Sequence, residues 1–146
     1  RIYCKKNLKK SIKYREKASY GEIMKFIKRV KQNKKNTLKF FKENIKLGKK
    51  IFLYGASTKG NTLLQYYGLT NKEIPFASER TKTKWGKYTI GSGVEIISEA
   101  NARKLNPDYF FVMPYGFISE FIKREKKWLN SGGKFILPYP KFKILR

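Results

Sequence analysis

The feature that most constrains the fold is a short apolar run that leads directly into a glycine turn and a helix. Ile51–Tyr54 (IFLY) is apolar, Gly55 follows at once, and Asn61–Tyr67 has a helical pattern that ends at Gly68. Similar apolar runs recur further along and alternate with helical stretches. This alternation predicts an α/β fold, in which right-handed crossovers join the strands of a parallel sheet.

The other expected elements complete one domain that is preceded by a long helix. The capping-box spacing at Ser19–Glu22 begins a helix over about residues 20–46, either continuous or broken near residues 33–36. We therefore expect a Rossmann-like, mostly parallel sheet flanked by helices over residues 19–146, after a linker from an upstream domain over residues 1–18. Further strands are predicted at residues 74–77, 94–97, 109–113 and 134–137, and further helices at residues 98–105 and 117–129.

The composition leaves little for catalysis. Cys4 is the only cysteine and histidine is absent, which removes disulfides, zinc sites of the Cys/His type and the usual near-neutral base. We expect no catalytic residue, no metal and no cofactor in this chain. No apolar run reaches the roughly 18 to 20 residues of a membrane span, and no signal peptide is recognisable, so we expect a cytoplasmic protein.

The strong positive charge favours anionic ligands. Lys and Arg number 35 against 10 Asp and Glu, a formal net charge of +25. The lysines are scattered over the whole chain, and no zinc-finger, RRM or KH signature accompanies them. We therefore expect attraction of small phosphorylated ligands and no specific binding of nucleic acid.

The turn after the first strand carries the strongest binding signal. It combines small residues, a helix start and hydroxyl donors, which are the requirements of a phosphate site. It matches neither the P-loop nor the three-glycine dinucleotide fingerprint, so a tight turn without a ligand remains the alternative. Ser57 and Thr58 would donate and Lys59 would supply countercharge. The expected contacts are Gly55, Ser57, Thr58, Lys59, Gly60 and Asn61.

Further candidates follow the second and fourth strands. Glu79 lies where Rossmann-like folds place an acid that binds a ribose hydroxyl, and Arg80 comes next. A surface acid in a lysine-rich chain is the alternative for Glu79. Tyr115 would add an aromatic wall, unless it and Phe117 only cap the core. Because ligands of open α/β sheets bind beyond the carboxyl ends of the strands, we expect these residues to share one cleft with the Gly55 turn.

Consecutive blocks of the chain resemble the C-terminal domain of S-adenosylmethionine-dependent sugar C-methyltransferases, including the 3-C-methyltransferases of deoxysugar pathways. The similarity runs in order over about Ile51–Pro140, the opening RIY is similar to the end of a preceding domain, and residues 20–47 are similar to the family's connecting helix. The chain departs from the family at Lys82 and Ile90, where prolines are common, and at Tyr115-Gly116 in place of Trp-His or Trp-Asn. The blocks are YGASTKGNTLLQYYG, SERTKTKWGKYTIGSGVEIISE, NPDYFFVMPYGFISEFIKRE and SGGKFILPYP.

The resemblance implies a function for the domain as part of a larger enzyme. Such an enzyme forms an enolate beside a sugar ketone, and the enolate takes the methyl group of S-adenosylmethionine. The C-terminal domain helps to hold the nucleotide diphosphate sugar, while the base, the donor site and a zinc-binding part belong to an N-terminal portion absent from this chain. The alternative is a stand-alone nucleotide- or NAD-binding Rossmann-like module.

Overall fold

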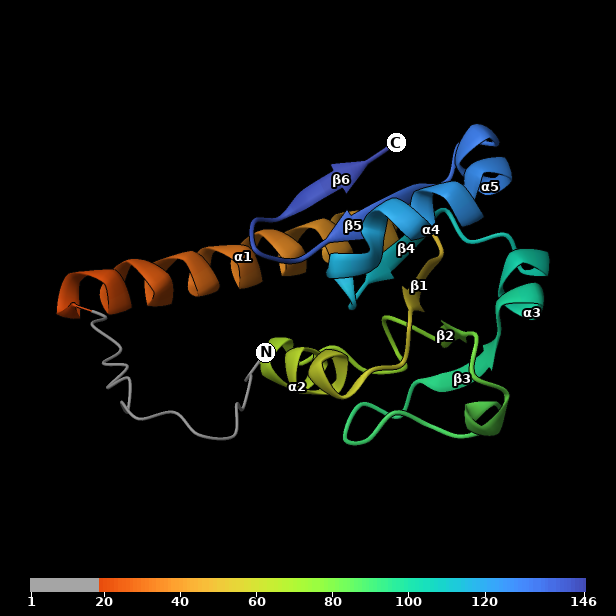
Figure 1. Cartoon of the computed structure of the whole chain (residues 1–146), viewed down its shortest axis with the longest axis horizontal. Helices are drawn as coiled ribbons and strands as arrows, with labels where there is room; N and C mark the ends of the chain where they lie inside the picture. The colour runs from red at the N-terminus through yellow and green to blue at the C-terminus, as the bar shows by residue number, and fades with distance from the viewer. Residues whose placement is uncertain (1–18) are drawn as a thin grey trace, which may run out of the picture.

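The computed structural model of the protein describes residues 19–146, and the expected linker and the opening RIY lie outside them. Helices and strands mostly alternate along the described chain, except that a 3-10 turn alone separates β2 from β3 and that β6 follows β5 directly (Figure 1). The helices are α1 (Tyr20–Lys46), α2 (Thr58–Tyr67), α3 (Glu99–Lys104), α4 (Ile118–Arg124) and α5 (Lys126–Asn130). The strands are β1 (Ile51–Tyr54), β2 (Phe76–Glu79), β3 (Glu95–Ser98), β4 (Tyr109–Val112), β5 (Lys134–Leu137) and β6 (Lys143–Leu145). Short 3-10 turns are η1 (Lys82–Lys84) and η2 (Tyr115–Phe117).

The strands form one sheet in the order β3-β2-β1-β4-β5-β6. The first five strands are parallel to their neighbours, and β6 runs antiparallel to β5. This is the strand order of dinucleotide-binding folds, in which the direction of winding reverses between β1 and β4. The predicted fold class, a Rossmann-like and mostly parallel sheet with a long N-terminal helix, is therefore confirmed.

Both faces of the sheet are covered by helices, so the central strands are apolar on both sides. Phe41 of α1 and Leu64 of α2 pack on one face, against Leu53 and other strand residues. Phe121 of α4 and Trp128 of α5 pack on the opposite face, together with α3. Burial on two faces explains why β1 is a continuous apolar run without alternation.

Helix α1 begins at the predicted capping box and continues without a break. The Ser19 hydroxyl accepts a hydrogen bond from the Glu22 N–H at 3.3 Å, and the Glu22 carboxylate accepts one from the Ser19 N–H at 2.8 Å. The alternative of a break near residues 33–36 is wrong. Asn33 is buried and donates to the Pro140 carbonyl at 2.9 Å, so its polar side chain holds the C-terminal segment against the helix.

The boundaries of α2 and β2 differ most from the prediction. Helix α2 begins at Thr58 rather than at Asn61, because the Ser57 hydroxyl caps it by accepting from the Gly60 N–H at 3.1 Å. Strand β2 covers Phe76–Glu79 rather than residues 74–77. It begins after Pro75, which has no N–H to donate to the sheet. Glu79, expected just past the strand, is therefore its last residue.

The expected helix over residues 117–129 is divided into α4 and α5. Glu125 stands between them with a backbone that departs from the helix (φ −99°, ψ 19°). Its carboxylate is buried and accepts a hydrogen bond from the Tyr54 hydroxyl at 2.7 Å.

Strand β6 (Lys143–Leu145) was not predicted from the sequence. It is a short, exposed edge strand that follows a proline-rich turn. Within residues 19–146, no helix is long and apolar enough to cross a membrane.

Replacement of Gly133 by alanine tests the packing between α5 and β5. A Cβ at this position would overlap Cε2 of Trp128, whose indole N–H donates to the Pro107 carbonyl at 2.8 Å. We expect Gly133→Ala to lower the free energy of unfolding by about 1–3 kcal/mol, as overpacking of a core does. Urea unfolding followed by circular dichroism measures the loss. Gly116→Ala is the control, since open space surrounds Gly116; its effect should stay within about 0.5 kcal/mol. Equal midpoints for the two variants would contradict this account.

Candidate functional site

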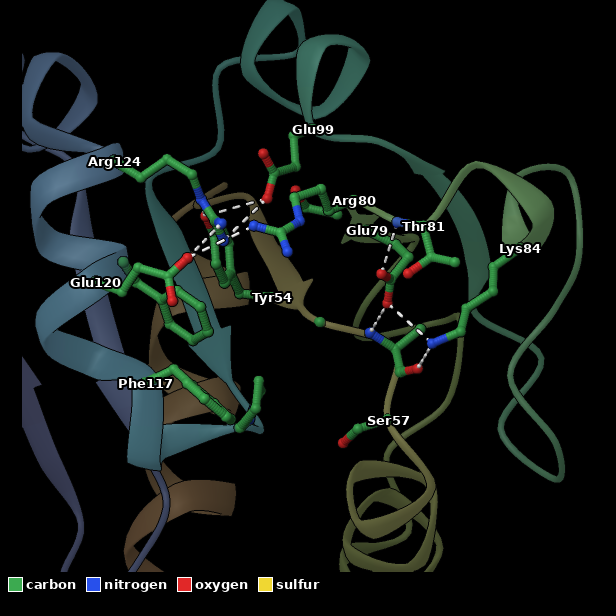
Figure 2. A pocket seen from close by; sticks show the side chains of 15 residues that line it. Tyr54, Ser57, Glu79, Arg80, Thr81, Lys84, Glu99, Phe117, Glu120 and Arg124 are labelled. Atoms are coloured by element: carbon green, nitrogen blue, oxygen red, sulfur yellow. Dashed lines mark hydrogen bonds and ion pairs between the residues drawn. The ribbon is translucent and has the colours of Figure 1, made fainter.

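A pocket of about 290 Å³ lies at the carboxyl ends of β1, β2 and β4, where the direction of winding reverses. The turn between β1 and α2 forms one side, the segment after β2 forms another, and α4 forms the side opposite (Figure 2). Open α/β sheets bind their ligands at this edge. The loops after the first, second and fourth strands do converge on one cleft, as the sequence predicts.

Packing explains the glycines of the turn between β1 and α2. Gly55 has a φ of 84°, and a Cβ there would lie 2.9 Å from Cγ of Pro114. At Gly60, a Cβ would lie 2.7 Å from Cγ of Met113. These glycines bring the turn close to the end of β4.

The first N–H groups of α2, from Thr58 and Lys59, make no hydrogen bond within residues 19–146.

Glu79 holds two sides of the pocket together. One of its carboxylate oxygens accepts from the Ala56 N–H at 3.0 Å, and the other accepts from the Thr81 N–H at 2.9 Å. The Lys84 ammonium lies 3.3 Å from the first oxygen. Burial raises the pKa of this carboxyl, but the Thr81 N–H and Lys84 outweigh burial and bring the pKa below its ordinary value. Glu79 is therefore ionised at neutral pH and fixes the shape of both loops.

Two cations on the β2 side of the pocket differ in how strongly other protein groups hold them. The Lys84 ammonium also donates to the Ala56 carbonyl at 2.9 Å, so this lysine bridges the two loops. The Arg80 side chain is 74% exposed, and its described ion pair is a 3.6 Å contact with Glu120. Exposed pairs of this length contribute little to stability. Arg80 is consequently available to an anion in the pocket.

An ion-pair network supports the α4 side and the floor of the pocket. Arg124 lies 3.1 Å from both the Tyr54 hydroxyl and the Glu99 carboxylate. Arg103 contacts both oxygens of the buried Glu125, at 2.8 and 2.5 Å. Burial and the hydrogen bond to Glu125 raise the pKa of Tyr54 above its ordinary value, so its hydroxyl stays protonated. Figure 2 shows Arg124, Glu99 and Tyr54 gathered at one end of the site.

Two buried polar atoms have no partner within residues 19–146, the Ser78 hydroxyl and the Asn61 amide oxygen. Ser78 lines the pocket and is only 2% exposed. A buried polar group without a hydrogen bond carries a free-energy cost, which a bound ligand can relieve. Ser78 is thus a potential ligand contact on the floor of the site.

The family model for the C-methyltransferase C-terminal domain matches residues 6–140 of the chain. This chain belongs to that family. The resemblance found in the sequence is thereby confirmed. A curated relative, the C-methyltransferase NovU of Streptomyces niveus, is 40% identical over 98 residues. The match covers 67% of this chain and 23% of NovU, so most of that relative's length lies outside it.

The pocket of this C-methyltransferase C-terminal domain brings together part of the predicted site. Gly55 and Ser57 line it from the turn, and Glu79 and Arg80 line it from the end of β2. The side chain of Glu79 is turned toward the protein backbone, where it binds two N–H groups. Thr58, Gly60 and Asn61 belong to the first turn of α2 but do not line the pocket.

Two predicted residues lie elsewhere. Lys59 lines a separate, mainly apolar cavity between α1 and α2. Tyr115 packs edge-on against Tyr139, with ring centroids 4.6 Å apart, and does not line the pocket. The expected aromatic wall is formed instead by Phe117 and Phe121. A 3-10 turn has about three residues per turn, so Tyr115 and Phe117 of η2 point in different directions.

Sequence reasoning missed several residues of the pocket. Lys84 and Arg124 are single members of a chain rich in basic residues, and no local pattern distinguishes them. Ser78 precedes Glu79 in the strand and could have been found by its place at the strand end. Glu99 is the first residue after β3 and could have been found by the same rule. Polar residues at the carboxyl ends of all the parallel strands were the available signal.

The role of Glu79 predicts a pH-dependent loss of stability in Glu79→Gln. The amide keeps one acceptor oxygen, so either the Ala56 or the Thr81 N–H loses its partner, at a cost of about 1–3 kcal/mol at pH 7. The folded-state pKa of Glu79 is lowered, so its contribution is present above the unfolded pKa of about 4.3 and is lost as pH falls through the folded value. The difference between parent and variant should therefore shrink toward pH 3.

Urea unfolding at pH 7 and pH 3 measures this difference. Glu43→Gln is the matched control, because Glu43 is exposed and its carboxylate lies 3.8 Å from the Lys39 ammonium. That variant should change stability by less than about 0.5 kcal/mol at pH 7. A Glu79→Gln deficit of the same size at both pH values would show that ionisation of Glu79 is not what stabilises the loops.

Proposed function

We propose that this domain binds the nucleotide diphosphate sugar substrate of an S-adenosylmethionine-dependent sugar C-methyltransferase, and that methyl transfer takes place in a part of the protein outside this chain. Membership of the C-methyltransferase C-terminal domain family supports the class of reaction. The pocket at the β1–β4 reversal supports the binding role, because it lies at the ligand-binding edge of this kind of sheet.

The observation that carries the proposal is the set of unused polar groups around one pocket. Within residues 19–146 the Ser78 hydroxyl is buried without a partner, and Arg80, two residues further along, is mostly exposed. Ser57, the N-cap of α2, also lines the pocket, so the positive end of this helix dipole faces the same edge of the sheet. The Arg80 guanidinium can donate to a diphosphate, and hydroxyl groups of a ribose or sugar complement the serine.

The acids of the pocket support a binding role rather than proton transfer. Both oxygens of Glu79 accept hydrogen bonds from backbone N–H groups. Glu99 is paired with Arg103 and Arg124, each at 3.1 Å. Glu120, the third acid of the lining, lies 3.1 Å from Arg124. Carboxylates that are already held by N–H groups or arginines are poor bases for a proton next to a sugar ketone. Under this proposal, the base and the methyl donor belong to the remainder of the enzyme.

The strand order also favours a second candidate, a nucleotide- or NAD-binding module. In dinucleotide sites an acid at the end of the second strand binds the ribose hydroxyls. Glu79 stands in that place, but its oxygens bind Ala56 and Thr81. The substrate-binding role therefore comes first, and titration with NAD beside a nucleotide diphosphate sugar separates the two.

Arg80→Ala tests the anion contact. If Arg80 pairs with the diphosphate, its loss should weaken binding of uridine diphosphate glucose about tenfold, or about 1.4 kcal/mol. Titration calorimetry at low salt measures the Kd. Lys59→Ala is the control, since it removes the same charge from a side chain outside the pocket, and should change the Kd less than about threefold. A larger effect of Lys59→Ala than of Arg80→Ala would restore the lysine to the main role.

Titration with S-adenosylmethionine tests the division of labour. The sulfonium group of this donor is positive, and the chain has a net charge of +25 and cations at its pocket. Electrostatic repulsion and the absence of a recognisable donor loop predict no heat of binding for the chain alone. A Kd below about 1 mM would place the donor site in this domain and contradict the proposal.

A further inference from the structure

Phe117 is an exposed aromatic residue at the edge of the pocket. It belongs to the η2 turn after β4, is 60% exposed, and leans on Phe121, with ring centroids 6.3 Å apart and an angle of 38°. Phe121 is buried in the core below it. In Figure 2 the Phe117 side chain extends into the site from the α4 side, across from Ser57. One part of the pocket wall is therefore an aromatic ring supported from behind and open in front.

The pocket combines an apolar side with charged groups. Pro114, Phe117 and Phe121 form the apolar side, and Glu120 and Arg124 also line the pocket from α4. Arg80 and Lys84 line it from the segment after β2, and the Arg80 guanidinium lies 3.6 Å from the Glu120 carboxylate. A nucleotide diphosphate likewise combines a base that is flat and apolar on its faces with a charged diphosphate. The apolar side therefore suits the base, and the exposed Arg80 suits the diphosphate.

We propose that Phe117 stacks against the base of the nucleotide, while the diphosphate faces Arg80. This inference rests on the proposed function and adds the orientation of the ligand in the pocket. The ring of Phe117 offers a π face and no hydrogen-bonding group. Base stacking on aromatic side chains tolerates every base, so uridine and thymidine diphosphates should bind with similar Kd values.

The sugar is the other part of the ligand that could meet an aromatic ring. Its hydroxyls require hydrogen-bonding partners, which the polar end of the pocket supplies through Ser78, Glu99 and Arg124. Phe117 satisfies none of them. The base is therefore the better occupant of the apolar side, and a sugar phosphate without a base provides the comparison.

Calorimetric titration of four variants with three probes tests the stacking. The probes are uridine diphosphate, inorganic pyrophosphate and glucose 1-phosphate. Phe117→Ala and Phe117→Leu should raise the Kd for uridine diphosphate about tenfold and leave that for pyrophosphate within about twofold. Phe117→Tyr keeps the ring and should retain binding. Tyr115→Ala is the matched control, an aromatic residue of the same turn outside the pocket; it should change neither Kd.

The outcomes separate this inference from the proposed function. Binding of uridine diphosphate with the same Kd in Phe117→Ala and the parent would overturn the stacking and leave the pocket's function in place. An equal loss of glucose 1-phosphate binding would assign the ring to the sugar and also overturn it. Failure of the unaltered chain to bind uridine diphosphate would overturn both. Circular dichroism of each variant confirms that the exposed position tolerates the change.

Discussion

The fold depends on a buried carboxylate, that of Glu125, which must be paired. Its side chain is 1% exposed, Arg103 contacts both oxygens, and the Tyr54 hydroxyl donates to it at 2.7 Å. Removing one partner of a buried ion pair costs about 3–5 kcal/mol, because the remaining charge stays desolvated. The end of β1, helix α3 and the junction of α4 and α5 are therefore held in one arrangement. That arrangement sets the floor and one wall of the pocket.

Glu79 fixes the opposite wall, so the acids nearest the pocket serve mainly to hold the structure. Their pairing also neutralises Lys84 and Arg124, which leaves Arg80 as the most exposed cation of the pocket lining. The net charge of +25 belongs largely to lysines scattered over the surface. Such charge raises the local concentration of anions over about a Debye length, roughly 8 Å at physiological salt. Attraction of anions is thus general, whereas the proposed recognition of a ligand depends on a few groups at one edge of the sheet.

Sequence patterns were sufficient for the fold and insufficient for some of its boundaries. The apolar run of β1 is followed by Gly55 and a capped helix, a pattern that leaves few alternatives to a parallel α/β sheet. The order of the remaining elements indicates how the strands are connected. The break at Glu125 was unpredictable, because it depends on Arg103 and Tyr54, which are distant in sequence. The strand β6 is too short and exposed to leave a hydrophobic pattern. Local rules fail where tertiary partners decide the backbone.

The site was predicted at the level of loops and less well at the level of side chains. The carboxyl ends of parallel strands meet at one edge, so Gly55, Glu79 and the segment after β4 had to converge. Which side chains enter the pocket depends on the geometry of each turn: η2 directs Phe117 inward and Tyr115 toward Tyr139. Gly55 and Gly60 pack so closely against Pro114 and Met113 that a Cβ on either glycine would clash. Close packing of this kind and a phosphate-binding motif both require glycine. A glycine-rich turn therefore predicts that another segment of the chain packs closely against it, and only the charges around the turn indicate a ligand.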